Sequence, residues 1–371
     1  MAPASKERQL TVLIGRFSPF HKGHAELVKR ALERSEYVLI IIGSAHQSRT
    51  TKNPWTAGER QQMIRAWHQE HVRSERGNYE REEVRLLFAA QRDHPYNQQR
   101  WLTDVQALIR GWNPGEAWLT GADRDSSTFY LKEFPNLKLD LVQEDTRISV
   151  QVTASSIRDL YFGNTLGNRS ISTDEVDLIA EAFVPSTTLS YLKSFRSSPE
   201  YEQLVSEYNH INSYKAAWNA APYKPTFVTV DSVVVQAGHV LLIKRRSEPG
   251  KGLWALPGGF LNENEWMFEG AIRELREETR LKVPEPVIRG SLKADQVFDK
   301  PDRSLRGRTV TRAFLFQLPD HVVDGRVELP QVKGDDDAEK AKWFPLAEAL
   351  AMSDQLFEDH HAIIETMLGK L

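Results

Sequence analysis

The chain has 371 residues, which is more than one ordinary hydrophobic core accommodates, so two domains are expected. Its formal net charge of −3 argues against nucleic acid as a partner bound through bulk electrostatics, and the absence of cysteine excludes disulfides, thiolate zinc sites and cysteine nucleophiles. The start, MAPASKERQL, has no apolar signal segment, and no apolar run is long enough to span a bilayer. These properties fit a cytoplasmic enzyme that acts on small molecules, binds neither nucleic acid nor membrane, and could form a homo-oligomer.

The first third of the chain alternates apolar strands with amphipathic helices. Residues 10–14 and 37–42 are apolar runs typical of buried strands, and residues 22–33 between them have helical spacing. Residues 117–120 and 137–142 are further short strand candidates. This alternation predicts a Rossmann-like α/β domain with a doubly wound parallel sheet.

Residues 15–24, GRFSPFHKGH, connect the first strand to the first helix. A helix N-terminus offers unpaired N–H groups and a partial positive charge, which favour an anion. Gly15 allows the backbone to approach a ligand, and His21 and His24 lie one turn apart, so both imidazoles can point at the same phosphates. Two histidines alone are more often structural. The whole stretch, however, resembles the HxGH signature of nucleotidylyltransferases, in the form found in nicotinamide mononucleotide adenylyltransferases.

Further segments extend this resemblance over most of residues 1–190. Residues 53–60, NPWTAGER, resemble the NPxTxxER segment of the family, and residues 121–123, GAD, follow a strand where the family binds the nucleotide. Residues 153–158, TASSIR, are similar to the second signature, S-[GSA]-T-x-I-R, with a hydroxyl kept at both substituted positions. An acceptor other than a pyridine mononucleotide, such as pantetheine phosphate or a flavin, fits these segments less well.

The resemblance implies adenylyl transfer from ATP to nicotinamide mononucleotide, which gives NAD and pyrophosphate. Such a reaction needs positioning and charge neutralisation, with Mg²⁺ or Mn²⁺ bridging the phosphates. The motifs do not decide between the amide and the acid mononucleotide, and the likeness to archaeal-type enzymes favours the amide. The implied catalytic residues are His21, His24 and Arg158. The residues implied to bind ATP and substrate are Gly15, Arg16, Phe17, Gly121, Asp123, Thr153 and Ser155. Trp55, Trp101 and Trp118 are either core residues or platforms for the pyridine ring.

The middle of the chain is helical over residues 174–218, and the segment 220–225, AAPYKP, breaks this pattern. Beyond the break, residues 227–236 and 240–245 are predicted strands joined by a hairpin turn, and residues 312–318 form another strand. The predicted organisation is an N-terminal domain over residues 1–190, a helical connector over residues 191–224 and a C-terminal domain over residues 225–371.

Residues 259–281 contain the acidic run Arg273-Glu274-Leu275-Arg276-Glu277-Glu278. On a helix, Glu274, Glu277 and Glu278 share one face, where their charges repel one another unless a cation lies among them. Oxygen ligands of this kind suit Mg²⁺ or Mn²⁺. Taken alone, the run could equally be a solvated charged face with Arg273 and Glu277 as an ordinary i,i+4 pair.

The spacing of Gly259, Glu265, Arg273 and the glutamates resembles the Nudix box, G-x5-E-x7-R-E-U-x-E-E-x-G-U, where U is aliphatic. The resemblance implies a Nudix α/β/α sandwich in which Glu274, Glu277 and Glu278 bind metal, Glu277 and Glu278 being also catalytic. Arg280 stands where the family has its final glycine, so we expect either a different helix exit or about 1 kcal/mol of local strain. Asn264 is the expected helix cap.

Residues 302–308, DRSLRGR, are similar to a DRDPRGR-like segment of Nudix ADP-ribose hydrolases, with departures at Ser304 and Leu305. This implies hydrolysis of ADP-ribose to AMP and ribose 5-phosphate, and thus a bifunctional enzyme of NAD metabolism. The alternative is a Nudix domain that senses ADP-ribose or NAD, or acts on another nucleoside diphosphate. Glu339 and residues 335–337 are candidates for the catalytic base, although a charged run is usually only solvated.

Overall fold

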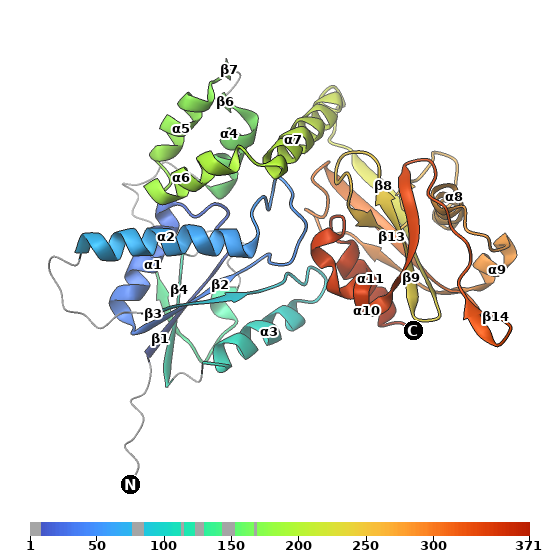
Figure 1. Ribbon diagram of the computed structural model, residues 1–371, viewed down its shortest axis with the longest axis horizontal. Helices are drawn as coiled ribbons and strands as arrows, with labels where there is room; N and C mark the ends of the chain where they lie inside the picture. The colour runs from blue at the N-terminus through green and yellow to red at the C-terminus, as the bar shows by residue number, and fades with distance from the viewer. Residues whose placement is uncertain (1–8, 76–84, 113–114, 123–129, 143–152, 167–168) are drawn as a thin grey trace, which may run out of the picture. The chain divides into compact units, whose positions relative to one another are not determined.

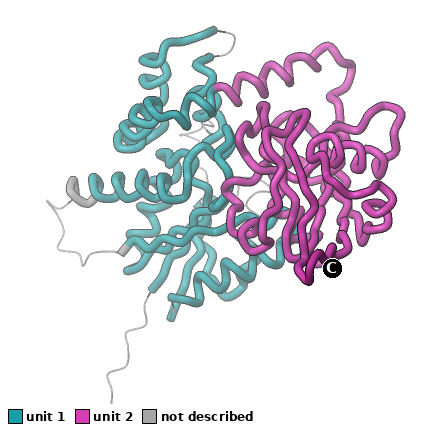
Figure 2. The backbone as a smooth tube through the Cα atoms, turned by 45° about the vertical axis from the view of Figure 1, so that its right-hand side comes forward, with its two compact units in different colours: residues 1–205 teal, residues 206–371 magenta. Residues whose placement is uncertain are grey.

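The computed structural model describes residues 9–75, 85–112, 115–122, 130–142, 153–166 and 169–371. The chain divides into two compact units, residues 1–205 and residues 206–371 (Figure 2). The helix α7, Pro199–Ala217, runs across this division. Among the helices in the described ranges, none is long and apolar enough to cross a membrane.

The first unit is built on a parallel five-stranded sheet with the order β3-β2-β1-β4-β5. Its strands and the helices between them are β1 Gln9–Gly15, α1 Lys22–Arg34, β2 Tyr37–Ile42, α2 Ala57–Glu75, β3 Arg85–Ala90, α3 Gln98–Arg110, β4 Glu116–Gly121 and β5 Lys138–Leu141. Figure 1 shows α3 on the opposite side of the strands from α1 and α2. The predicted doubly wound Rossmann-like domain is confirmed.

Successive side chains along the strands of the first unit point to opposite faces of the sheet, and this explains its layers. Val12 and Leu39 face one side of the sheet, where they pack with Leu102 and Val105 of α3. The chain reverses its strand order between β1 and β4, so the loops that follow these two strands diverge at the carboxyl edge of the sheet. Ligands of doubly wound sheets bind at this position, and Gly15 ends β1 there.

A helical layer completes the first unit. Its elements are α4 Ala154–Gly163, the short strands β6 Thr165–Leu166 and β7 Arg169–Ser170, α5 Thr173–Glu181 and α6 Ser186–Phe195. Trp55 is only 1% exposed and contacts the rings of Tyr161, Phe162 and Phe195. Of the two alternatives given for Trp55, core residue or platform for the pyridine ring, the burial favours the core residue.

The second unit contains a mixed sheet with the order β10-β9-β8-β13-β12, to which β11 and β16 add by pairing with β8 and β9. Its elements are β8 Thr226–Gln236, β9 His239–Arg245, β10 Trp254–Ala255, β11 Gly258–Phe260, α8 Met267–Thr279, α9 Glu285–Gly290, β12 Leu292–Phe298, β13 Arg308–Gln317, β14 His321–Val323, β15 Arg326–Glu328, β16 Ala338–Pro345, α10 Leu346–Ala351, the 3-10 turn η3 Ser353–Gln355 and α11 His360–Leu368. Figure 1 shows α8 and α11 on opposite sides of the strands, which confirms the predicted sandwich.

The hairpin between β8 and β9 is the one that the sequence predicts. Ala237 and Gly238 both have positive φ, 45° and 71°, as a two-residue turn of the primed type requires. The start of α8 differs from the prediction. The helix begins at Met267, and its N-cap is Trp266, which makes no side-chain cap. Asn264 lies too far upstream to cap it.

Arg280 closes α8 in the left-handed conformation, with φ 44° and ψ 36°. Its backbone N–H still donates to the carbonyl of Arg276, and its side chain forms an exposed ion pair with Asp335. The helix exit is therefore the one that a glycine would make, and an arginine adopts it at a steric cost.

Exchanging Arg280 for glycine and for alanine should separate this backbone cost from the ion pair. Both variants lose the pair with Asp335, but only alanine keeps a Cβ in the left-handed region. We expect Arg280→Gly to exceed Arg280→Ala by about 1 kcal/mol in free energy of unfolding, measured by urea titration. Equal stabilities would show that the exit carries no steric strain.

Glu207 of α7 is 5% exposed within the second unit. Burial, together with the charges of Glu248 and Glu358, raises the pKa of its carboxyl to about 8. The unfolded chain ionises this group from its ordinary value of 4.5 upward. The native state therefore loses stability as the pH rises from about 4.5 to about 8.

Glu207→Gln should remove this pH-dependent penalty. We expect the variant to be more stable than the parent by about 2 kcal/mol at pH 7.5, and the gain to vanish near pH 4.5. The check is the free energy of unfolding measured across that range. Glu202→Gln, an exposed position of the same helix, is the matched control. A gain for Glu207→Gln that does not change with pH would contradict the assignment.

Candidate active sites

His21 and His24 lie together where β1 passes into α1. Each backbone N–H of the pair donates to the Nδ1 atom of the other residue at 3.4 Å, and the rings stack with centroids 3.6 Å apart. Because Nδ1 accepts in both rings, the proton of each neutral imidazole is on Nε2. The fold thus prepares two Nε2–H donors at a helix N-terminus, the arrangement that the HxGH stretch predicted.

The residues before this pair form a tight turn. Phe17 has a positive φ of 51° and is buried, and a Cβ added at Gly15 would lie 3.1 Å from its ring. The Phe17 ring also contacts His24 edge-on, with centroids 4.9 Å apart. Gly15 and Phe17 therefore position the histidines by packing, while the Arg16 side chain is exposed and reaches toward solvent.

Arg158 is buried, and its guanidinium joins distant segments of the first unit. It donates to the carbonyl of Ser18 at 2.5 Å, to the carbonyl of Thr51 at 3.1 Å and to the hydroxyl of Ser155 at 3.0 Å. Burial, together with the nearby charge of Arg16, lowers its pKa to about 10. The family resemblance implies a catalytic role for Arg158. In the structure its side chain fixes the loop that precedes His21.

Arg60 ends the NPWTAGER segment, and the sequence analysis gave it no role of its own. It is 1% exposed and donates to the carbonyls of Arg16 at 2.7 Å, Gly43 at 2.8 Å and Ser44 at 3.1 Å. Burial lowers its pKa to about 10, and the charge of Arg16 again contributes. Arg16, Arg60 and Arg158 thus place positive charge beside the histidines, which favours a polyanionic ligand.

Asp93 organises the loop after β2. Its carboxylate accepts hydrogen bonds from the backbone N–H of Ser44 at 3.2 Å, the Ser44 hydroxyl at 2.6 Å and the Gln47 amide at 3.0 Å. Ser44 and His46 have positive φ values of 48° and 55°. Asp93 follows β3, and only the parallel pairing of β2 and β3 brings it here, so no local sequence signal could have identified it.

The other residues predicted to bind ATP lie at the ends of β4 and α4. Gly121 is buried against Leu131, whose side chain would be 2.6 Å from an added Cβ. Thr153 caps α4 by accepting from the backbone N–H of Ser156, and Ser155 is exposed in the first turn. Asp123 lies outside the described residues.

In the second unit, the Arg273 guanidinium gathers the carboxylates of the box. It donates to Glu265 at 2.6 and 3.0 Å, to Glu274 at 2.9 Å and to Glu277 at 2.9 Å. This hydrogen bonding lowers the pKa of Glu265 to about 2. The predicted pair of Arg273 and Glu277 is present, as part of a larger network in which Glu265 anchors the loop before α8.

Two glycines allow the glutamates to approach the backbone. The backbone N–H of Gly258 donates to Glu278 at 2.8 Å. A Cβ at Gly259 would lie only 2.5 Å from the Glu274 carboxylate. Burial raises the pKa of Glu274, and it raises that of Glu278 to about 8, with the neighbouring charge of Glu274 adding to the effect. Glu274 is half-buried and Glu278 is buried, and the interaction between their charges favours a cation beside them.

These residues fit a divalent metal ion by their chemistry. Carboxylate oxygens are hard ligands. Because Gly259 has no Cβ, the Glu274 carboxylate can lie against the backbone at this position. As the side chains stand, no group of three or more acidic or histidine residues in the described ranges is placed to hold a metal. Arg273 occupies the position between Glu274 and Glu277.

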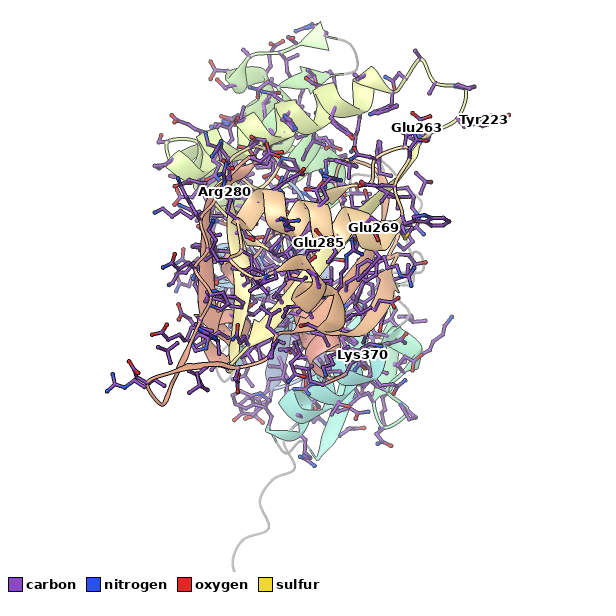
Figure 3. The ribbon with its side chains drawn as sticks, turned by 90° about the vertical axis from the view of Figure 1, so that its right-hand side faces the viewer. Tyr223, Glu263, Glu269, Arg280, Glu285 and Lys370 are labelled. Carbon is purple, nitrogen blue, oxygen red and sulfur yellow. The ribbon has the colours of Figure 1, made fainter. Side chains whose placement is uncertain are left out.

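The candidates for a catalytic base have different partners in the structure. Asp335 pairs with Arg280, and Glu339 pairs with Lys244 at 3.6 Å. Asp336 lies near enough to Glu274 to raise its pKa. Of these acids, Asp336 is therefore the one beside the predicted metal ligands. Figure 3 shows Arg280 at the end of α8 away from Glu269.

His360 is a further residue that the sequence did not reveal. Its Nδ1 accepts from the backbone N–H of Leu256 at 2.9 Å, and its Nε2 lies 3.8 Å from Asp231. Burial lowers its pKa, a direction that agrees with Nδ1 acting as this acceptor. His360 thus fixes the strand segment that leads to Gly258, from a position about one hundred residues away along the chain.

In comparisons with known proteins, each half of the chain matches one family model. The Cytidylyltransferase-like family model matches residues 12–173 and the NUDIX domain model matches residues 225–367. A bifunctional NMN adenylyltransferase/ADP ribose pyrophosphatase from Francisella tularensis is 32% identical, with a TM-score of 0.82 over 98% of this chain and 99% of that chain. A second structure of this enzyme, complexed with AMP and Mn ion, has a TM-score of 0.80.

Two further relatives each match one half of the chain. A nicotinamide/nicotinic acid mononucleotide adenylyltransferase from Acinetobacter baylyi is 32% identical over 53% of this chain and 92% of its own length. An ADP-ribose pyrophosphatase from Methanocaldococcus jannaschii is 35% identical over 37% of this chain and 70% of its own length. The chain therefore belongs to the family of bifunctional NMN adenylyltransferases/ADP-ribose pyrophosphatases.

Proposed function

We propose that residues 1–190 transfer the adenylyl group of ATP to nicotinamide mononucleotide. The observation that carries this is the pair of Nε2–H donors on His21 and His24 beside the arginine cluster at the strand-order switch. The 5′-phosphate of the mononucleotide attacks the α-phosphorus of ATP, the bond to the β-phosphate oxygen breaks, and pyrophosphate leaves. Charge accumulates on phosphate oxygens in this step, and preorganised donors lower its barrier.

The remaining residues of the first site have supporting roles in this proposal. Gly15, Phe17 and Gly121 shape the backbone, Thr153 and Ser155 offer hydroxyls and N–H groups at the start of α4, and Arg158 stabilises the leaving pyrophosphate while holding the loop at Ser18. Because ATP and pyridine nucleotides are the substrates, we place the reaction in the cytoplasm. The amide mononucleotide is the proposed acceptor.

For residues 225–371 we propose hydrolysis of ADP-ribose to AMP and ribose 5-phosphate. The observation that carries this is that Arg273 holds Glu274 and Glu277 together, while the backbone N–H of Gly258 holds Glu278 on the same helix. Glu274 and Glu278 would hold the metal with Glu277, and Arg273 and Gly258 orient these carboxylates. Mg²⁺, or Mn²⁺ in its place, supplies a polarised phosphoryl oxygen and an activated water when bound. For the first site we propose the same ions, bound through the phosphates of ATP.

His24→Ala should reduce NAD synthesis selectively. Loss of one donor to the developing charge lowers kcat about 100-fold, while ADP-ribose hydrolysis by the same protein stays unchanged. The measurement is chromatography of products from ATP with each pyridine mononucleotide in turn. Glu26→Gln, an exposed position on the same helix, is the matched control. NAD synthesis at the parental rate would refute the role of His24, and no dinucleotide from the unmodified protein would refute the proposed reaction.

Glu278→Gln should have the reverse effect. The amide still accepts the Gly258 N–H but loses the charge that a metal needs, so ADP-ribose hydrolysis should fall about 1,000-fold with NAD synthesis intact. Product chromatography with and without EDTA measures both activities. Glu269→Gln is the matched control, because Glu269 lies on the same helix and pairs with Arg289 near Glu285 (Figure 3). Unchanged turnover by Glu278→Gln would exclude the hydrolase mechanism and favour a ligand-sensing role.

A further inference from the structure

A group of charged and aromatic side chains adjoins the glutamates of α8 without belonging to the Nudix box. We call it the Arg245 cluster, and it consists of Arg245, Phe260, Arg306, Phe357 and Glu358. Its members come from the end of β9, from β11, from the loop before β13 and from the segment before α11. None of them was assigned a role by the sequence motifs.

The two arginines of this cluster lie around one aromatic ring. The Arg245 guanidinium is 4.1 Å from the centre of the Phe357 ring, and that of Arg306 is 6.0 Å from the same ring and 5.2 Å from Phe260. Arg245 also interacts electrostatically with Glu278 on one side and with Glu358 on another. Phe260 directly follows Gly259, so the positive charge of the two arginines lies close to the predicted metal ligands.

Glu358 is held in place by the loop that carries Arg306. The Ser304 hydroxyl accepts from the backbone N–H and the Nε of Arg306 at 3.4 and 3.3 Å, and it is near enough to Glu358 to lower the pKa of that carboxyl. The next residue, Asp359, forms a buried two-point ion pair with Arg303, at 2.7 and 2.9 Å. These contacts fasten the segment before α11 to the loop before β13.

The backbone at Glu358 is also unusual. Its φ is 44°, in the left-handed region that a glutamate adopts only at a cost. Strained residues of this kind persist where surrounding contacts over-determine them and concentrate at functional positions. Burial raises the pKa of the Glu358 carboxyl, while Arg306, Ser304 and Arg303 favour its ionised form. The residue as a whole is half-buried.

The cluster therefore brings charges of both signs together. Arg245 interacts with both Glu278 and Glu358, Arg306 interacts with Glu358, and Glu207 interacts with Glu248 and Glu358. The arginines next to the metal ligands are suited to bind phosphate groups. A neutral group rich in hydroxyls matches Glu358, because a carboxylate accepts hydrogen bonds from hydroxyls and repels a further phosphate.

We propose that Glu358 is a specificity-determining residue of the hydrolase site, which selects a nucleoside diphosphate linked to a sugar over a nucleoside triphosphate. This inference rests on the proposed hydrolysis of ADP-ribose. Arg245 and Arg306 bind the diphosphate, and Glu358 accepts hydrogen bonds from the sugar hydroxyls and excludes a terminal phosphate. Selection by repulsion of the wrong substrate accompanies selection by attraction of the right one.

The test is the ratio of kcat/KM for ADP-ribose to kcat/KM for ATP, measured without any mononucleotide so that the first site is idle. In Glu358→Gln we expect this ratio to fall at least about tenfold, through a higher KM for ADP-ribose and faster release of AMP from ATP. Asp354→Asn is the matched control, because Asp354 is an exposed carboxylate of η3 on the same segment. The control should leave the ratio unchanged.

Thermal unfolding of each variant keeps a structural effect apart from a change of specificity. If Glu358→Gln does not fold, Ser304→Ala removes the hydroxyl between Arg306 and Glu358 and should lower the same ratio in the same direction. An unchanged ratio in the folded variant overturns the proposal. So does an equal loss of kcat for both substrates with KM unaltered, which would place Glu358 in the chemistry. ADP-ribose left intact by the unmodified protein refutes the hydrolase function itself, a distinct outcome.

Discussion

The Arg273 guanidinium binds three carboxylates, those of Glu265, Glu274 and Glu277, and the geometry of the second site depends on this single cation. Acids brought so close repel one another, and a helix face that carries them would otherwise spread its side chains into solvent. Arg273 supplies the compensating charge from the same helix and occupies the position between Glu274 and Glu277. These side chains must therefore rearrange before three carboxylates can hold a metal.

The first site presents the opposite electrostatic problem. The charge of Arg16 acts against those of Arg60 and Arg158 and lowers the pKa of both. Arg60 and Arg158 donate their N–H groups to backbone carbonyls, among them those of Gly43 and Ser18. Carbonyl oxygens carry only partial charge, so they fix the direction of each guanidinium without neutralising it. The positive field thus remains available to phosphates. One site is an acidic set that needs a cation, and the other is a basic set that needs an anion.

Local patterns predicted the parts of this molecule that depend on neighbours in the chain. The stretch from Gly15 to His24 forms its turn and helix start within ten residues, and Arg273 meets Glu277 one helical turn away. The Rossmann-like sheet and the Nudix sandwich followed from alternation and motif spacing. The start of α8 was misplaced because Asn264 has the chemistry of a cap without its position, and tertiary packing begins the helix at Met267.

Contacts between distant segments could not be predicted in the same way. Asp93 reaches Ser44 through the pairing of two strands, and His360 reaches Leu256 across the second unit. Neither residue lies in a motif, and an aspartate after a strand or a histidine at a helix start is ordinary in any sequence. Arg158 was recognised by its motif, yet its bonds to Ser18 and Thr51 show a second role that only the fold creates.

Backbone strain connects these distant contacts to function. Phe17, Ser44 and Glu358 all have left-handed φ values, and each lies beside a proposed catalytic or binding group. Such conformations persist only where other interactions exceed their cost. Ser44 is held by Asp93 and Arg60, and the segment of Glu358 is held by the Arg303–Asp359 pair. The residues that sequence reasoning missed are therefore largely those that stabilise strained turns, so they act on the chemistry by fixing the backbone that carries it.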